Sequence, residues 1–219
     1  PKLSVTGFVA KLGTANFFNQ IAMMIVQIVM NKSLTYYGSQ SVYGESIPLA
    51  CAGIITKVGM VFFSICIGLS QGMQPIVSFN YGAGNYKKVK QAYRLAAGIG
   101  TIISVIAFFA FQIFPRQLIG IFGSSQNEAY YTFAVRYFRI YMFFTFLNAI
   151  QPISSNFFTA IGKPGKGIFL SLTRQIIFLL PLIVIFPLFL GVDGIMYAGP
   201  IADFIAAMVS MILIYKEFG

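Results

Sequence analysis

Residues 58–80 read VGMVFFSICIGLSQGMQPIVSFN, a run without a single charged side chain. A helix rises about 1.5 Å per residue, and roughly 20 mostly apolar residues carry it across the hydrocarbon core of a bilayer. The run is therefore long enough to span a membrane as one helix. A membrane-spanning β-strand would be about ten residues long and would alternate apolar and polar side chains, a pattern that this stretch does not have.

Comparable runs recur along the chain, at 12–31, 95–114, 140–162, 175–192 and 194–215, the last broken only by Asp203. The composition agrees, because 58% of the residues are hydrophobic and 9% are charged. The mean hydropathy of +0.80 is also far from that of a water-soluble domain. We therefore predict an all-α integral membrane protein in which residues 1–219 form one bundle of six transmembrane helices. The predicted helices are 8–31, 48–80, 92–114, 136–162, 167–191 and 194–215, with an outer interfacial segment at 115–135.

The net charge of +10 does not predict a nucleic-acid surface, because the basic residues lie in the gaps between apolar runs. We expect membrane lipid and no nucleic acid as a partner. The chain has no histidine, and fifteen residues of one helix place Cys51 and Cys66 roughly 22 Å apart, too far for a disulfide. We expect no metal site, no cofactor other than a coupling ion, and no enzyme activity, because no nucleophile, base and orienting acid form a set.

The basic residues also predict how the chain crosses the membrane, because they accumulate in cytoplasmic loops. With the first helix running outward, the inner segments hold Lys2, Lys11, Lys87, Lys88, Lys90, Arg94, Lys163, Lys166 and Lys216. The outer segments hold Lys32, Arg116, Arg136 and Arg139. We predict a multi-pass protein of the cytoplasmic membrane with both termini of this segment in the cytoplasm.

Two predicted helices carry a polar stripe. In the first, Asn16, Gln20, Gln27 and Asn31 share one face, with Asn19 beside them. In the second, Lys57, Ser64, Gln71 and Ser78 follow at steps of seven. Such side chains either join neighbouring helices through hydrogen bonds or line a water-filled cavity. For Lys57, a functional role and snorkelling of the ammonium group to the membrane surface both remain open.

The remaining intramembrane polar residues lie in the last three predicted helices. Asn148 and Gln151 share one side of the fourth, where we interpret Pro152 as tolerated, with a bending point as the alternative. Arg174 and Asp203 lie on the two arms of the last hairpin, about 6 Å apart in depth. An ion pair that holds these two helices together is our preferred interpretation, and a proton-coupling role for Asp203 is the alternative.

GLSQGMQP at 68–75 is followed by NYGAGN at 80–85, near the end of the second predicted helix. This pair of segments is similar to the signature of the MATE family of multidrug exporters, which lies at the end of the second helix of each lobe. PRQLIGIF at 115–122, AIGK at 160–163 and GVDG at 191–194 also resemble family segments, most of all those of the MepA-like and DinF-like branches. The resemblance implies one lobe, the C-terminal one, of a twelve-helix antiporter that exports cationic or amphipathic drugs in exchange for protons or sodium.

The resemblance also bears on the site residues. NorM-like members carry carboxylates on the first and fourth helices of this lobe, where this chain has only amides: Asn16, Asn19, Gln20, Asn148 and Gln151. It therefore implies that the coupling acid lies in the N-terminal lobe and that these amides line the cleft, together with Gln27, Lys57 and Gln71. A lipid-linked oligosaccharide flippase of the same superfamily and a non-transporting membrane scaffold remain alternatives.

Overall fold

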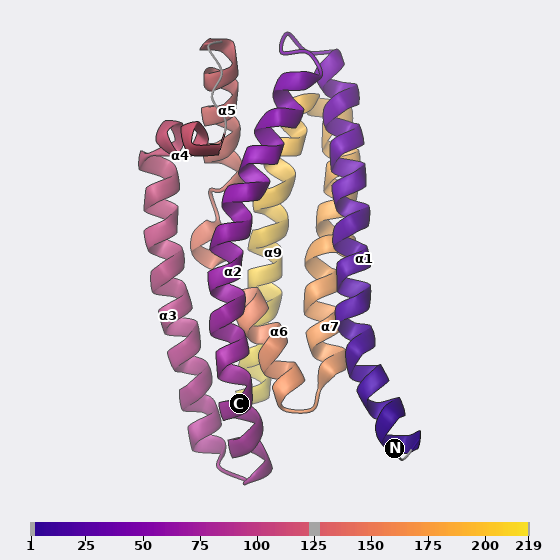
Figure 1. Ribbon diagram of the computed structural model, residues 1–219, viewed down its shortest axis with the longest axis vertical. Helices are drawn as coiled ribbons and strands as arrows, with labels where there is room; N and C mark the ends of the chain where they lie inside the picture. The colour runs from indigo at the N-terminus through magenta and orange to yellow at the C-terminus, as the bar shows by residue number, and fades with distance from the viewer. Residues whose placement is uncertain (1–2, 123–127, 219) are drawn as a thin grey trace.

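The computed structural model describes the backbone of residues 3–122 and 128–218, and the side chains of these residues except 3–16, 18, 19 and 129. This part of the chain is made of helices joined by short turns, without a strand. The long helices run along the longest axis of the molecule (Figure 1). The first three are α1 (Leu3–Ser39), α2 (Ser46–Gly82) and α3 (Tyr86–Ile113).

The second half of the chain completes the bundle with interrupted helices. The short α4 (Pro115–Phe122) leads into a fourth crossing made of α5 (Glu128–Tyr141), the 3-10 turn η1 (Thr145–Leu147) and α6 (Ile150–Ala160). The fifth crossing joins α7 (Pro164–Leu172), the π-helix η2 (Thr173–Leu179) and α8 (Leu180–Leu190), and α9 (Val192–Phe218) is the last. Within the described residues, four helices are long and apolar enough to cross a membrane: α2, α3, the continuous 164–190 helix and α9. The prediction of an all-α membrane bundle is confirmed.

The predicted fourth helix, 136–162, differs from the structure, in which turns and η1 interrupt it between Tyr141 and Ile150. Pro152 limits how far α6 can extend toward its N-terminus, because it has no N–H to donate to the carbonyl of Asn148 and its ring crowds that carbonyl. In the first turn of α6 the missing donor costs nothing. Pro152 therefore lies in the first turn of α6, which begins at Ile150, and not in the middle of one continuous helix. The helix before the break also begins earlier than predicted, because α5 starts at Glu128, inside the segment assigned to the interface.

The fifth crossing widens into a π-helix over Thr173–Leu179, just before Pro181. Pro181 has no N–H for the carbonyl four residues earlier, and one extra residue in the turn shifts the hydrogen-bond pattern around this gap. The widened turn starts at the residue before Arg174. It thus fixes the direction in which the Arg174 side chain leaves the helix.

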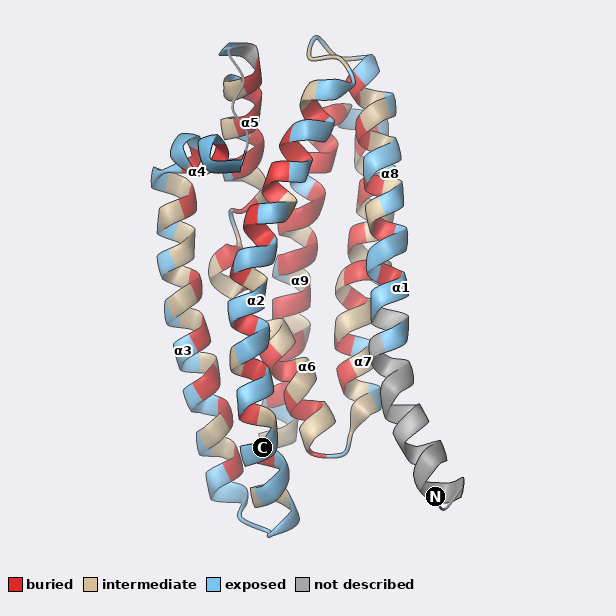
Figure 2. Ribbon diagram, in the orientation of Figure 1, coloured by how far each residue is buried: buried red, intermediate tan, exposed pale blue. Residues whose placement is uncertain are grey.

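The core lies where α9 packs against α8, η2, α5 and α6, and about half of the residues of α9 are buried (Figure 2). Two glycines allow close approaches between helices. A Cβ at Gly199 would lie 2.4 Å from the ring of Tyr141, and one at Gly100 would lie 2.6 Å from the side chain of Ile153. α9 therefore contacts α5, and α3 contacts α6, at distances that no larger residue permits.

The beginning of α1 and the end of α9 lie at the same end of the bundle (Figure 1). There Glu217 near the end of α9 forms ion pairs with Lys163 and Lys166 of the α6–α7 connection, the second at 2.7 Å. Burial raises the pKa of the Glu217 carboxyl, but the hydrogen bonds from the two lysines outweigh burial and hold the pKa below its ordinary value. The end of α9 is thus fixed to the α6–α7 connection by charge.

Candidate functional site

Arg174 and Asp203 form an ion pair in the middle of the bundle. Arg174 Nε donates to Asp203 Oδ1 at 2.6 Å, and the two side chains are 15% and 4% exposed. Asn148 Nδ2 donates to the other carboxylate oxygen at 2.9 Å, and the guanidinium carbon of Arg174 lies 5.2 Å from the centroid of the Phe63 ring. The cluster joins η2, α9, the break before α6, and α2.

Both oxygens of Asp203 therefore have donors, one of them a permanent cation. Such a pair offsets the desolvation of its two charges, and removal of one partner would leave the other charge buried and alone. The arrangement is suited to holding α9 against η2. Asn148, predicted to line the cleft, is buried and donates its amide N–H to Asp203.

The polar stripe of α2 lies on the exposed side of that helix. Lys57, Ser64, Gln71 and Ser78 are all exposed, whereas core positions such as Phe62 are buried. The hydroxyl of Ser78 donates to the carbonyl of Ala160 at 3.0 Å. Lys57 forms no ion pair with the residues that the structure describes. One exposed side of α2 thus carries a cation, Lys57, and a primary amide, Gln71.

α1 presents a similar surface. Gln20 is exposed, and Gln27 is half-buried and donates to Asn31 Oδ1 at 3.0 Å. The side chains of Asn16 and Asn19 lie outside the described residues.

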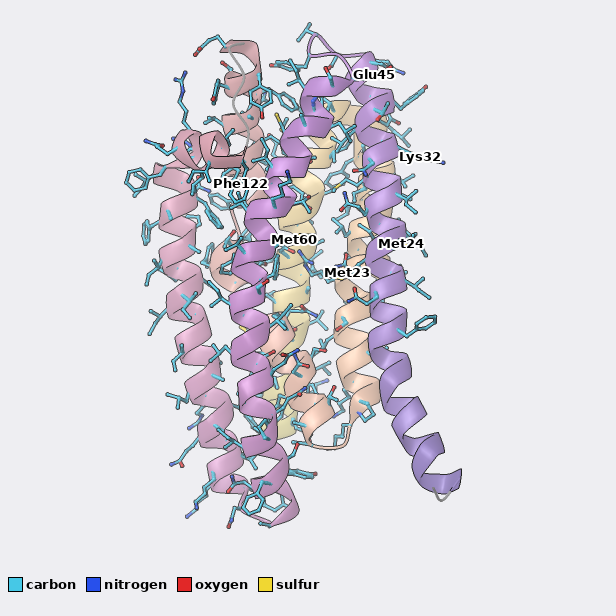
Figure 3. All side chains as sticks on the ribbon, in the orientation of Figure 1. Met23, Met24, Lys32, Glu45, Met60 and Phe122 are labelled. Carbon is cyan, nitrogen blue, oxygen red and sulfur yellow. The ribbon has the colours of Figure 1, made fainter. Side chains whose placement is uncertain are left out.

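Exposed methionines accompany the polar groups: Met23 and Met24 on α1 and Met60 on α2 are 43%, 66% and 63% exposed. Figure 3 shows them at similar height on the two helices. Flexible thioether side chains beside amides form a surface that adapts to ligands of different shapes.

Sequence reasoning missed a second polar contact between α2 and α6. Gln74 Nε2 donates to Asn156 Oδ1 at 2.9 Å, and Asn156 Nδ2 donates to the hydroxyl of Ser70 at 2.6 Å. Ser70 and Gln74 are four residues apart on one helix face, which is the signal that could have paired them with a single amide. Gln151, predicted to line the cleft, is half-buried on the same α6. Among the described residues, no group of three histidine, cysteine, aspartate or glutamate side chains could hold a metal ion.

The sequence model of the MatE family matches residues 15–185. The chain belongs to the MatE family. Among curated MatE-like relatives, the multidrug export protein MepA of Staphylococcus aureus strain bovine RF122 / ET3-1 is 24% identical over 217 residues, which are 98% of this chain and 45% of the relative. MepA of Staphylococcus saprophyticus is 26% identical over 207 residues, or 94% of this chain and 43% of the relative. The chain thus spans slightly less than half the length of these relatives.

Solved MATE structures share the fold. A multidrug resistance MATE family transporter of the MOP superfamily in its outward-facing conformation superposes with a TM-score of 0.86 at 20% identity, over 97% of this chain and 46% of the other. A MOP superfamily transporter from Pyrococcus furiosus, described as having a binding pocket of reverse polarity, superposes with a TM-score of 0.87 at 19% identity, with the same coverage. The family and the fold expected from the sequence are therefore confirmed.

Proposed function

We propose that this MatE chain is the C-terminal six-helix lobe of an ion-coupled antiporter that exports cationic or amphipathic drugs across the cytoplasmic membrane. The observation that carries the proposal is the family match together with its extent: nearly all of this chain aligns with less than half of each multidrug export relative. An N-terminal lobe would then be its partner.

The surface of α1 and α2 supports a cleft between the lobes. A helix face that contacts lipid tails is apolar, because a charged or amide group there costs several kcal/mol. The outward side of α3 fits that description, with Ile102, Ile106 and Phe109 exposed. The exposed side of α2 instead presents Lys57 and Gln71, so it suits a water-filled path better than lipid.

The charges support a coupling ion, proton or sodium, that binds away from Asp203. This carboxylate is already compensated by Arg174 and Asn148, so a second cation would gain little from it. The orientation with both ends of the segment in the cytoplasm is supported by the basic residues at the end of the bundle where α9 stops, such as Lys163 and Lys166.

Ethidium efflux tests the proposal in drug-sensitive cells that express the complete gene containing this segment, compared with cells that express residues 1–219 alone. We expect efflux from the complete protein, its loss when an ionophore collapses the ion gradients, and no efflux from the segment alone. A complete protein that moves no dye, in membranes where its presence is verified by immunoblot, would overturn the drug-export function in favour of the flippase or scaffold alternatives.

A further inference from the structure

Three arginines surround a hollow at the end of the bundle opposite the beginning of α1 and the end of α9. The hollow has a volume of about 680 Å³ and lies between the end of α3, α4 and α5. Its lining includes Arg116, Arg136 and Arg139, with Glu128 as the single acid and Tyr131 at its wall. The charge of these lining side chains is positive.

A second hollow of about 330 Å³ adjoins the first, and both are lined by Arg139 and Ile140. Its other walls are mostly apolar and come from the break after α5, from α9 and, through Gln112, from α3; the apolar or aromatic members are Phe143, Phe144, Tyr197, Pro200 and Ile201. Phe143 is 49% exposed, so this hollow opens to the outside of the bundle. A positively charged chamber and an apolar groove thus meet at one arginine.

The arginines differ in how far they are neutralised. Arg136 pairs with Asp193 at 2.8 Å. Arg116 pairs with Glu128 at 3.4 Å, and the side chains of Arg116 and Glu128 are both more than half exposed. Arg139 forms no ion pair within the described part of the chain. Exposed pairs are weak and readily exchange partners, so at least Arg139 and Arg116 are available to an added anion.

The position along the bundle fits the level of lipid headgroups. The apolar outward side of α3 ends at Ile113, and the arginines follow directly on α4 and α5. The guanidinium of Arg116 stacks on the ring of Tyr131 at 5.1 Å, and tyrosine and arginine are typical of the membrane interface. The apolar groove is lined by Arg139 and also by Ile201 of α9.

We propose that the two hollows form one binding site for an anionic phospholipid. The phosphate group binds to Arg139 and Arg116, whose planar guanidinium groups can each hold two phosphate oxygens. One acyl chain follows the groove past Phe143 and Ile201. A free phosphate ion would satisfy the arginines but leave the groove without an occupant, which is why the lipid fits better. The site is independent of the drug cleft proposed for α1 and α2.

Native mass spectrometry of the purified protein in detergent tests this site. The probes are phosphatidylglycerol, phosphatidylcholine with the same acyl chains, and glycerol phosphate. Arg139→Gln removes the unpaired guanidinium, and Arg94→Gln, an exposed arginine on α3 at the other end of that helix, is the matched control for total charge. Phe143→Ser tests the groove without changing charge.

We expect the protein to bind phosphatidylglycerol in preference to the other two probes. Arg139→Gln should weaken this binding at least about tenfold, since a hydrogen bond to a charged group is typically worth a factor of that size. Phe143→Ser should weaken it as well, and Arg94→Gln should leave it unchanged. Equal binding by Arg139→Gln and Arg94→Gln would overturn the site, and glycerol phosphate that binds as tightly as the lipid would overturn the assignment to lipid.

Discussion

The ion pair between Arg174 and Asp203 should dominate the stability of the second half of the bundle. Its carboxylate is 4% exposed and its guanidinium 15% exposed, so neither charge can turn to water when its partner is removed. Truncating one member of such a buried pair costs about 3–5 kcal/mol, because the other charge stays buried without compensation. We therefore expect Asp203→Asn to lower the free energy of unfolding by about 3 kcal/mol or more.

The pair between Arg136 and Asp193 is a matched control, since it joins the same residue types but its side chains are 52% and 31% exposed. Asp193→Asn should cost at most about 1 kcal/mol. The assay is unfolding of the purified protein in mixed micelles of increasing denaturing-detergent content, followed by circular dichroism. The double variant with Arg174→Gln should recover part of the Asp203→Asn loss. An Asp203→Asn loss no larger than that of Asp193→Asn would refute the reasoning.

Three further results are expected from the same geometry. Gly199→Ala should lower the free energy of unfolding by about 1–3 kcal/mol, because the new Cβ would meet the ring of Tyr141. Gly98→Ala should not lower it, because a Cβ at Gly98 would point into open space. Equal effects of the two substitutions would contradict the close approach of Gly199 to Tyr141. The lowered pKa of Glu217 stabilises the fold above the ordinary glutamate value near 4.5, and this contribution is lost as pH falls through the lowered pKa. An unfolding series across acidic pH should therefore show less pH dependence in Glu217→Gln, and an identical series would count against the charge contact. Lys57→Gln should lower the apparent KM for ethidium efflux about fivefold if a cationic dye passes this lysine, since like charges about 4 Å apart in water repel by about 1 kcal/mol. An unchanged KM would place Lys57 away from the dye.

The helices themselves could be predicted because length and hydropathy decide them. The runs at 58–80 and 95–114 are apolar for long enough to indicate membrane-spanning helices. The structure has α2 and α3 at these positions. The Arg174 and Asp203 pair could be anticipated from depth alone, since two intramembrane charges on adjacent helices have few other partners.

The break before α6 and the role of Asn148 could not be predicted in the same way. A proline inside an apolar run is compatible with a continuous, a kinked or a broken helix, and neighbouring helices decide among them. The partner of Asn148 lies 55 residues away on α9, so no local pattern distinguishes a buried amide from one that lines a cleft. The same holds for Asn156, whose two partners are on α2.

Thiol labelling of α2 tests the central claim most directly, namely that its polar side lines a water-filled path. The native Cys51 and Cys66 are buried and would first be replaced by alanine. Single cysteines at Ser64 and Gln71 are compared with one at Ile106, which is 64% exposed on the apolar side of α3. In the complete protein in membranes, a water-soluble maleimide should label the two α2 positions, ethidium should slow that labelling, and Ile106→Cys should stay unlabelled. Labelling at Ile106→Cys as fast as at Gln71→Cys, or none at either α2 position, would contradict the account.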